Sequence, residues 1–114
     1  MCAALPTLKT SQDFKRVAAS GLKRVTPAFI LQFDKNATAG GFRFGLTVSR
    51  KVGNAVARNK VKRRLREMVR LYLRLHPATA GEIVLIGRTT AVHYDFARLC
   101  ADFDRAFAAL AGQA

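Results

Sequence analysis

The chain has 114 residues, of which 50% are hydrophobic and 24% are charged, and its formal net charge is +13 at pH 7. This length suits one domain with its own core, and this balance of apolar and charged residues excludes a disordered chain. So strong a positive charge predicts a polyanionic partner, which is nucleic acid or, less often, an anionic membrane surface.

The positive charge is concentrated in the first part of the chain. Residues 1–81 contain 17 Lys and Arg against three acidic residues, whereas residues 82–114 contain three Arg against four acidic residues. We therefore expect the binding surface to come from the first part, and we interpret residues 1–114 as a single domain.

The two cysteines, Cys2 and Cys100, show neither a metal-binding spacing nor a disulfide framework, and Cys100 falls among apolar residues that predict a buried thiol. The opening residues, MCAALPTLKTSQ, lack the basic segment and apolar run of a signal peptide. No apolar stretch approaches the roughly 20 residues that span a bilayer. We expect a cytoplasmic protein with no membrane partner.

A short helix is predicted over residues 10–21. Ser11 can cap it, Asp13 suits its first turn, and Gly21 can end it. A helix of this length must dock on a larger core to persist. Its apolar side is expected to consist of Leu8, Phe14, Val17 and Ala18.

Two strands are predicted next, over residues 27–33 and 42–49. Both segments are rich in aromatic and branched residues, and apolar residues alternate cleanly with others in 42–49. This pattern predicts a sheet with one face on the core and a second, polar face that carries Arg43 and Thr47.

A further strand is predicted over residues 82–88, which are apolar on both faces and therefore typical of a central strand. Short pairings near Val25 and Thr89 would bring the sheet to three or four strands. The last segment, about 95–111, has apolar residues at helical spacing and predicts an amphipathic helix that packs on the core. Its apolar stripe consists of Phe96, Leu99, Cys100, Phe103, Phe107 and Leu110.

The helix between these strands, from near Asn54 to just before His76, is unusually basic. Residues 58–74 are 17 residues that carry eight positive charges and one negative charge, Glu67. At about 100° per residue, six residues fall on one stripe that would pack on the sheet. They are Ala57, Val61, Leu65, Met68, Val69 and Tyr72. The expected element order is therefore α-β-β-α-β-α, an α+β fold with three helices.

The remaining arc of this helix carries Arg58, Lys62 and Arg66 in one row, with the other basic residues and Asn59 beside them. Like charges at this spacing repel one another, and an ordinary solvated face mixes both signs. The arc therefore indicates an anionic partner. Arg binds phosphates bidentately and stacks on bases, Asn bonds base edges, and a helix that begins at Asn54 offers free N–H groups to a phosphate.

The segment FGLTVSRKVGNAVARNKVKRRLRE, residues 44–67, closely resembles the signature of the bacterial ribonuclease P protein family. In that family a strand ending in Ser-x-Lys leads through Gly-Asn-Ala-Val into an Arg-Asn-Arg-type helix. Length, charge and element order agree as well, so the resemblance covers nearly the whole chain. The matching residues are Ser49, Lys51, Gly53, Asn54, Ala55, Val56, Arg58, Asn59, Lys62, Arg63 and Arg66.

The resemblance implies a function. Ribonuclease P removes the 5′ leader of precursor tRNA, and its RNA subunit performs the Mg²⁺-dependent hydrolysis. The implied role of this chain is the protein subunit, one per RNA subunit, which binds the catalytic RNA and the leader and is not catalytic alone. Mg²⁺ would be bound mainly through the RNA, with no organic cofactor. The family's βαβ crossover is left-handed, against the general rule.

The site residues follow from the basic arc and the resemblance together. The leader is expected in a cleft between the first helix and the sheet, and the basic helix is expected against the catalytic RNA. The cleft residues are Phe14, Arg43 and Thr47. The RNA-binding residues are Ser49, Arg50, Lys51, Asn54, Arg58, Asn59, Lys60, Lys62, Arg63, Arg66 and Arg70.

Three residues depart from the family pattern. Lys60 stands where a second Arg is commonest, Ala18 stands where a second aromatic residue is frequent, and Gln32 stands where Tyr is frequent. The resemblance therefore implies a cleft with reduced stacking, in which leader binding depends more on charge.

Three alternatives compete with this interpretation. An independent nuclease could use His76 and His93 as acid and base, but the seven acidic residues are scattered and form no metal-binding pattern in the sequence. A general RNA-binding protein, such as a ribosomal protein or RNA chaperone, fits the composition equally well. Only the spaced motif separates it from the ribonuclease P reading. A membrane-surface binder fits worse, because the basic helix lacks the bulky apolar face of interfacial helices.

Overall fold

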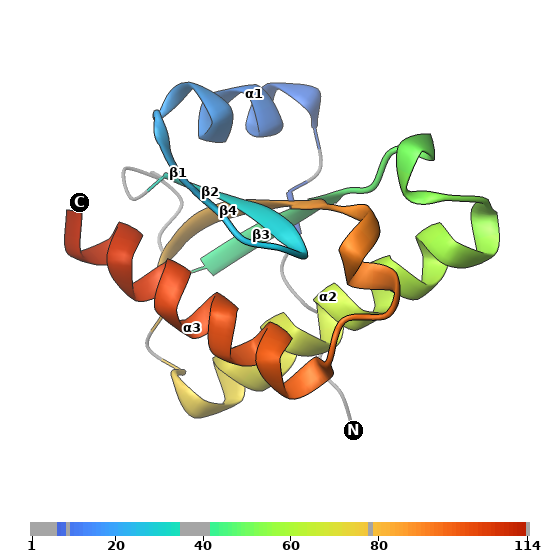
Figure 1. Ribbon diagram of the computed structural model, residues 1–114. Coiled ribbons are helices and arrows are strands. Elements are labelled where there is room, and N and C mark those ends of the chain that lie inside the picture. Colours follow the sequence, from blue (N-terminus) through green and yellow to red (C-terminus); the bar gives the residue numbers. More distant parts are fainter. Residues whose placement is uncertain (1–6, 9, 35–41, 78, 114) are drawn as a thin grey trace.

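The computed structural model describes residues 7–8, 10–34, 42–77 and 79–113 (Figure 1). The expectations for Cys2 and for most of the opening segment lie outside the described residues. The elements follow one another as α1 (Ser11–Ala19), β1 (Leu22–Val25), β2 (Phe29–Asp34), β3 (Phe42–Thr47), η1 (Arg50–Val52), α2 (Ala55–Leu75), β4 (Gly81–Gly87), η2 (Thr89–Val92) and α3 (Phe96–Gln113).

The α+β fold with three helices is confirmed, with one more strand in the chain order than α-β-β-α-β-α. The residues near Val25 form the full strand β1, whereas those near Thr89 form the 3₁₀ helix η2 and not a strand. The sheet has four strands in the order β1-β2-β4-β3. β1 and β2 are antiparallel, as are β2 and β4, while β3 and β4 run parallel. The predicted central position of β4 is confirmed.

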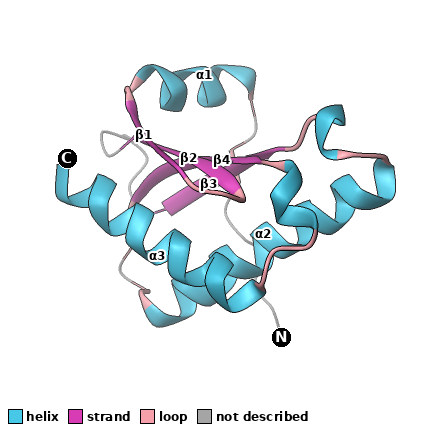
Figure 2. Ribbon diagram, in the orientation of Figure 1, coloured by secondary structure: helices cyan, strands magenta, loops and turns pink. Residues whose placement is uncertain are grey.

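Helices cover the two faces of the sheet unequally. α1 lies on one face, while α2 and α3 lie on the other (Figures 1 and 2). α2 connects the parallel strands β3 and β4; the left hand expected for this crossover stays a prediction. None of the helices in the described ranges combines the length and the apolarity that crossing a bilayer requires.

The main core fills the space between the sheet and the helices α2 and α3. Phe103 of α3 is fully buried there, and its ring centroid lies 6.2 Å from that of Phe29 and 5.1 Å from that of Tyr72. The apolar stripes predicted for α2 and α3 supply this core, although Cys100 is half-buried rather than buried. The stripe residues that are buried are Val61, Leu65, Met68, Val69, Leu99, Phe103, Phe107 and Leu110.

A smaller cluster lies between α1 and the opposite face of the sheet. It consists of the buried residues Leu8, Val17 and Val84, with Phe14 and Ile86 packed against them. Ala18, which was predicted to join this side, is exposed. The helix turns Ala18 outward because Val17, the residue before it, takes the buried position on the sheet.

Local chemistry sets the ends of the two helices that flank the site. The Thr10 hydroxyl accepts from the Asp13 amide at 3.1 Å, and the Asp13 carboxylate accepts from the Thr10 amide at 3.4 Å. This capping box makes Thr10 the cap of α1 in place of the predicted Ser11. α2 begins after Gly53, whose φ of 151° suits glycine. Asn54 then caps the helix by accepting from the Ala57 amide at 3.0 Å.

Candidate nucleic-acid interface

The basic face of α2 lies open to solvent along much of its length. Among the predicted RNA-binding residues, four are half-buried: Arg58, Lys60, Lys62 and Arg70. The others are exposed: Ser49, Arg50, Lys51, Asn54, Asn59, Arg63 and Arg66. The first three of these lie at η1, immediately before α2, so η1 and α2 form one continuous basic surface.

Two basic residues of α2 are engaged within the protein. Arg70 donates to Glu67 at 2.7 Å, so part of its charge is offset at the surface. Arg64 donates to the backbone carbonyl oxygen of Tyr94, and its guanidinium carbon lies 5.8 Å from the centroid of the Phe96 ring. Arg64 therefore links α2 to the start of α3, whereas its neighbour Arg63 stays exposed.

A groove of about 210 Å³ joins α2 to the first helix and the edge of the sheet. Phe14 of α1 lines this groove together with Lys62 and Arg66 of α2. The groove brings an aromatic ring and two cations to one space, although the three residues come from separate parts of the sequence. Such a combination suits single-stranded nucleic acid, whose bases stack on aromatic rings and whose phosphates bind cations. The remaining lining residues are Thr7, Leu8, Phe44, Gly45 and Leu46.

The chain before α1 closes one edge of the sheet beside this groove. The Leu8 amide donates to the Phe44 carbonyl at 2.9 Å, and Thr7 forms a parallel bridge to Phe44. This short pairing covers part of β3, which is an edge strand. One side of the groove is therefore formed by paired backbone of the segment before α1 and of β3.

Arg43, predicted as a cleft residue, is held by acidic side chains. Its guanidinium is ion-paired with Glu82 and lies 4.0 Å from Asp13. Glu82 is only 1% exposed, and its other carboxylate oxygen is ion-paired with Arg16 of α1. The hydrogen bonds that Arg16 donates to Glu82 and, to a smaller extent, to Asp13 raise the pKa of Arg16 above its usual value. The structure therefore uses Arg43 to bind α1 to the sheet.

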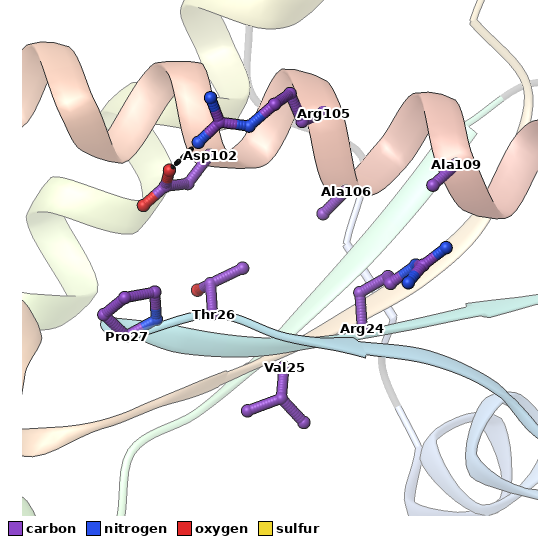
Figure 3. A pocket seen from close by; sticks show the side chains of 8 residues that line it. All are labelled: Arg24, Val25, Thr26, Pro27, Asp102, Arg105, Ala106 and Ala109. Carbon is purple, nitrogen blue, oxygen red and sulfur yellow. Dashed lines mark hydrogen bonds and ion pairs between the residues drawn. The ribbon is translucent and has the colours of Figure 1, made fainter.

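An apolar stripe next to α1 escaped the sequence analysis. Cross-strand pairing places Val25, Ile30, Ile86 and Thr47 in one row across the four strands. Ile86 packs with the α1-side cluster, and Val25 points away from α3 (Figure 3). Val25 is 58% exposed, and Thr47, the third predicted cleft residue, is exposed at the other end of the row. The sequence feature that could have revealed this row is the presence of apolar residues at the alternate positions of each strand, next to positions that face the main core.

A further pocket of about 360 Å³ lies on the other face of the sheet, between β1 and α3 (Figure 3). Arg24 and Arg105 line it with Asp102. Asp102 accepts from Arg105 at 2.5 Å and from the Tyr94 hydroxyl at 2.7 Å, so this acid is already bound.

The two histidines do not join a catalytic group. The His76 ring stacks on Tyr72 with centroids 4.3 Å apart, and His93 is an exposed residue that ends η2. Within the described part of the chain, no three His, Cys, Asp or Glu residues gather in a way that could hold a metal ion.

Comparison with known proteins decides the family. The family model described as Ribonuclease P matches residues 4–111 of the chain. The chain belongs to the ribonuclease P protein family. It is 42% identical over 98 residues to the ribonuclease P protein component of Gluconacetobacter diazotrophicus. The aligned region covers 86% of this chain and 84% of that protein. It is 40% identical over 106 residues to the component of Paramagnetospirillum magneticum, covering 90% and 80% respectively.

Solved ribonuclease P proteins share the fold. A structure from Staphylococcus aureus superposes with a TM-score of 0.73 at 28% identity and covers 91% of this chain and 94% of that one. A structure from Thermotoga maritima gives a TM-score of 0.69 at 27% identity, with 87% and 92% covered. As a ribonuclease P protein component, the chain has a place in tRNA processing within a ribonucleoprotein.

Proposed function

We propose that this chain binds the catalytic RNA of ribonuclease P and the 5′ leader of precursor tRNA, so that the RNA subunit can remove the leader. The observation that carries the proposal is the groove in which Phe14 meets Lys62 and Arg66. An aromatic ring beside two cations offers a base and its phosphates complementary partners at the same place. The groove also adjoins the exposed basic face of α2, so one protein surface can contact both RNAs.

The two RNAs have separate places in this proposal. The exposed residues of η1 and α2, including Lys51, Asn59 and Arg63, contact the catalytic RNA through its phosphates and base edges. The leader lies in the groove and continues over the apolar row that ends at Thr47. Because Arg43 is ion-paired with Glu82, its part in this proposal is to hold α1 on the sheet and not to bind the leader directly.

The chemistry of hydrolysis belongs to the RNA subunit in this proposal, and the protein alone is not catalytic. The surface of α2 offers guanidinium and ammonium groups, whereas Mg²⁺ takes oxygen ligands. Mg²⁺ is therefore bound mainly through the RNA, and the protein contributes by neutralising phosphates near the cleavage site. We propose a single RNA-binding domain over residues 1–114, one protein per RNA subunit, and action in the cytoplasm.

The test is cleavage of a 5′-extended precursor tRNA at low Mg²⁺ by bacterial ribonuclease P RNA, by the protein, and by the two together. We expect slow cleavage by the RNA, none by the protein, and fast cleavage by the pair. Cleavage by the protein alone would replace this proposal with an independent nuclease.

A general RNA-binding protein is the second candidate, because the exposed basic face of α2 would bind many RNAs. The same assay separates the two functions when binding is also measured on tRNA with and without a 5′ extension. A ribonuclease P subunit binds the extended substrate more tightly, whereas a general binder treats both alike and gives no stimulation.

A further inference from the structure

The Phe14 ring lies directly on the backbone of Gly45. A Cβ atom at residue 45 would lie 2.5 Å from Cζ and 2.6 Å from Cε2 of Phe14, which is closer than any real Cβ contact. Gly45 is buried in the middle of β3, where a side chain would normally fill the space between strand and helix. Its missing side chain therefore leaves the place that the ring occupies.

A cluster of charges fixes the helix that carries this ring. The buried Glu82 binds Arg16 through one carboxylate oxygen and Arg43 through the other. Asp34 lies 3.8 Å from Arg16, and Asp13 lies 3.0 Å from it. Arg16 is two residues after Phe14, so its bonds to the sheet restrain both the distance and the rotation of α1. A buried carboxylate that loses such partners is strongly unfavourable, and the cluster therefore holds together as a unit.

Phe14 needs such support, because α1 has nine residues and would not persist without docking. The exposed Ala18 and the half-buried Gln32 add no aromatic ring beside it. A ring that is already in place before RNA arrives costs less conformational entropy on binding. The placement of this one ring then determines how well the groove distinguishes a leader.

We infer that Gly45 and Glu82 are positioning residues for leader recognition, which act by holding the Phe14 ring in the groove before RNA binds. This inference rests on the proposed function. Gly45 acts through its missing side chain, which leaves room on the sheet for the Phe14 ring. Glu82 acts from the side, by fixing α1 through Arg16. Glu82 does not line the groove, and Gly45, which does, acts in this proposal through the ring that lies on it.

The experiment measures leader discrimination by the reconstituted holoenzyme, defined as its affinity for a precursor tRNA with a five-nucleotide leader divided by its affinity for the mature tRNA. The single variants are Phe14→Ala, Gly45→Ala and Glu82→Gln. The two double variants combine Phe14→Ala with Gly45→Ala and Phe14→Ala with Glu82→Gln. We expect Phe14→Ala to lower discrimination by about 5-fold to 150-fold, the equivalent of one stacked base. Gly45→Ala and Glu82→Gln should each lower discrimination by about 5-fold or more by the same equivalence, without changing affinity for mature tRNA.

The double variants distinguish positioning from a general structural role. If Gly45 and Glu82 act through the ring, neither substitution lowers discrimination further once Phe14 is Ala. A Cβ at Gly87 would lie 2.9 Å from Val61 on the opposite face, so Gly87→Ala is a control for strain away from the groove. Asp102→Asn, which breaks an ion pair with Arg105, is the control for a lost acid. Both controls should leave discrimination unchanged.

Two results would overturn the inference while the proposed function stands: wild-type discrimination in Gly45→Ala, or an additive loss in the double variants. If Glu82→Gln prevents folding, as circular dichroism would show, the inference is tested by Gly45→Ala alone and in combination with Phe14→Ala. If Phe14→Ala itself leaves discrimination unchanged, the leader site in the proposed function is wrong, and the inference is overturned with it.

Discussion

Arg64 of α2 donates a hydrogen bond to the backbone carbonyl oxygen of Tyr94, and its guanidinium carbon lies 5.8 Å from the centroid of the Phe96 ring. Its neighbour Arg63 is exposed on the same helix. The two arginines therefore have opposite roles, since Arg64 joins α2 to α3 and Arg63 faces outward. Substitution of each by Ala separates stability from RNA binding.

We expect Arg64→Ala to lower the free energy of unfolding by about 1–3 kcal/mol, because it leaves a carbonyl without its donor and removes a cation–π contact. Arg63→Ala should change that free energy by less than about 0.5 kcal/mol and should weaken binding of the catalytic RNA. Urea unfolding and a filter-binding titration measure the two quantities. Equal stability of the two variants, with equal loss of binding, would place Arg64 in the RNA interface.

The basic surface also predicts how RNA binding responds to salt. If the protein contacts six to ten phosphates, affinity should fall by roughly 10³–10⁵ between 50 and 200 mM salt. Arg66→Ala should lower the slope of log affinity against log salt concentration by about 1. Arg105, which is exposed on α3 and paired with Asp102, provides the control, and its substitution should leave the slope unchanged. A flat response in the wild-type protein would contradict the electrostatic account.

α2 and α3 were predictable because each carries a continuous apolar stripe, and α2 runs from Ala55 to Leu75 between the caps Asn54 and His76, close to its expected bounds. β1 was predicted only as a short pairing, since one of its four residues is half-buried and three are exposed. An edge strand that packs on so little core shows no alternation in its sequence. The strand pairing predicted near Thr89 was wrong, because the apolar neighbours Ala91 and Val92, which suggested a strand, belong to the 3₁₀ helix η2.

The candidate site was predictable as a helix face but not as a set of partners. Glu82 was read as part of an apolar strand, and its buried charge depends on Arg16 and Arg43, which are 66 and 39 residues away in sequence. The roles of Arg63 and Arg64 were equally invisible, because a helical wheel places α2 against the sheet without locating α3. Both features depend on how separate elements meet in three dimensions.

Burial and the nearby Asp104 raise the pKa of the Cys100 thiol. The thiolate is the reactive form, so a raised pKa leaves less of it at pH 8 and slows alkylation. In a Cys2→Ser chain, we expect the rate with iodoacetamide to reach half its maximum at a higher pH in the folded protein than in urea. Asp104→Asn should move the folded profile toward lower pH. Identical profiles in the folded and unfolded chains would show that the fold does not affect this thiol.

Ala18 offers a gain-of-function test of the groove. It is exposed on α1 one turn after Phe14, so a ring at residue 18 would lie next to the ring at residue 14. We expect Ala18→Phe to tighten binding of a leader-bearing precursor by about 5-fold or more, the lower end of what one stacked base contributes. Binding of mature tRNA should not change. Ala19→Phe adds the same ring about 100° further round the helix and should give no such gain. A similar gain from both variants would mean that added apolar surface, rather than a second stacking position, strengthens binding.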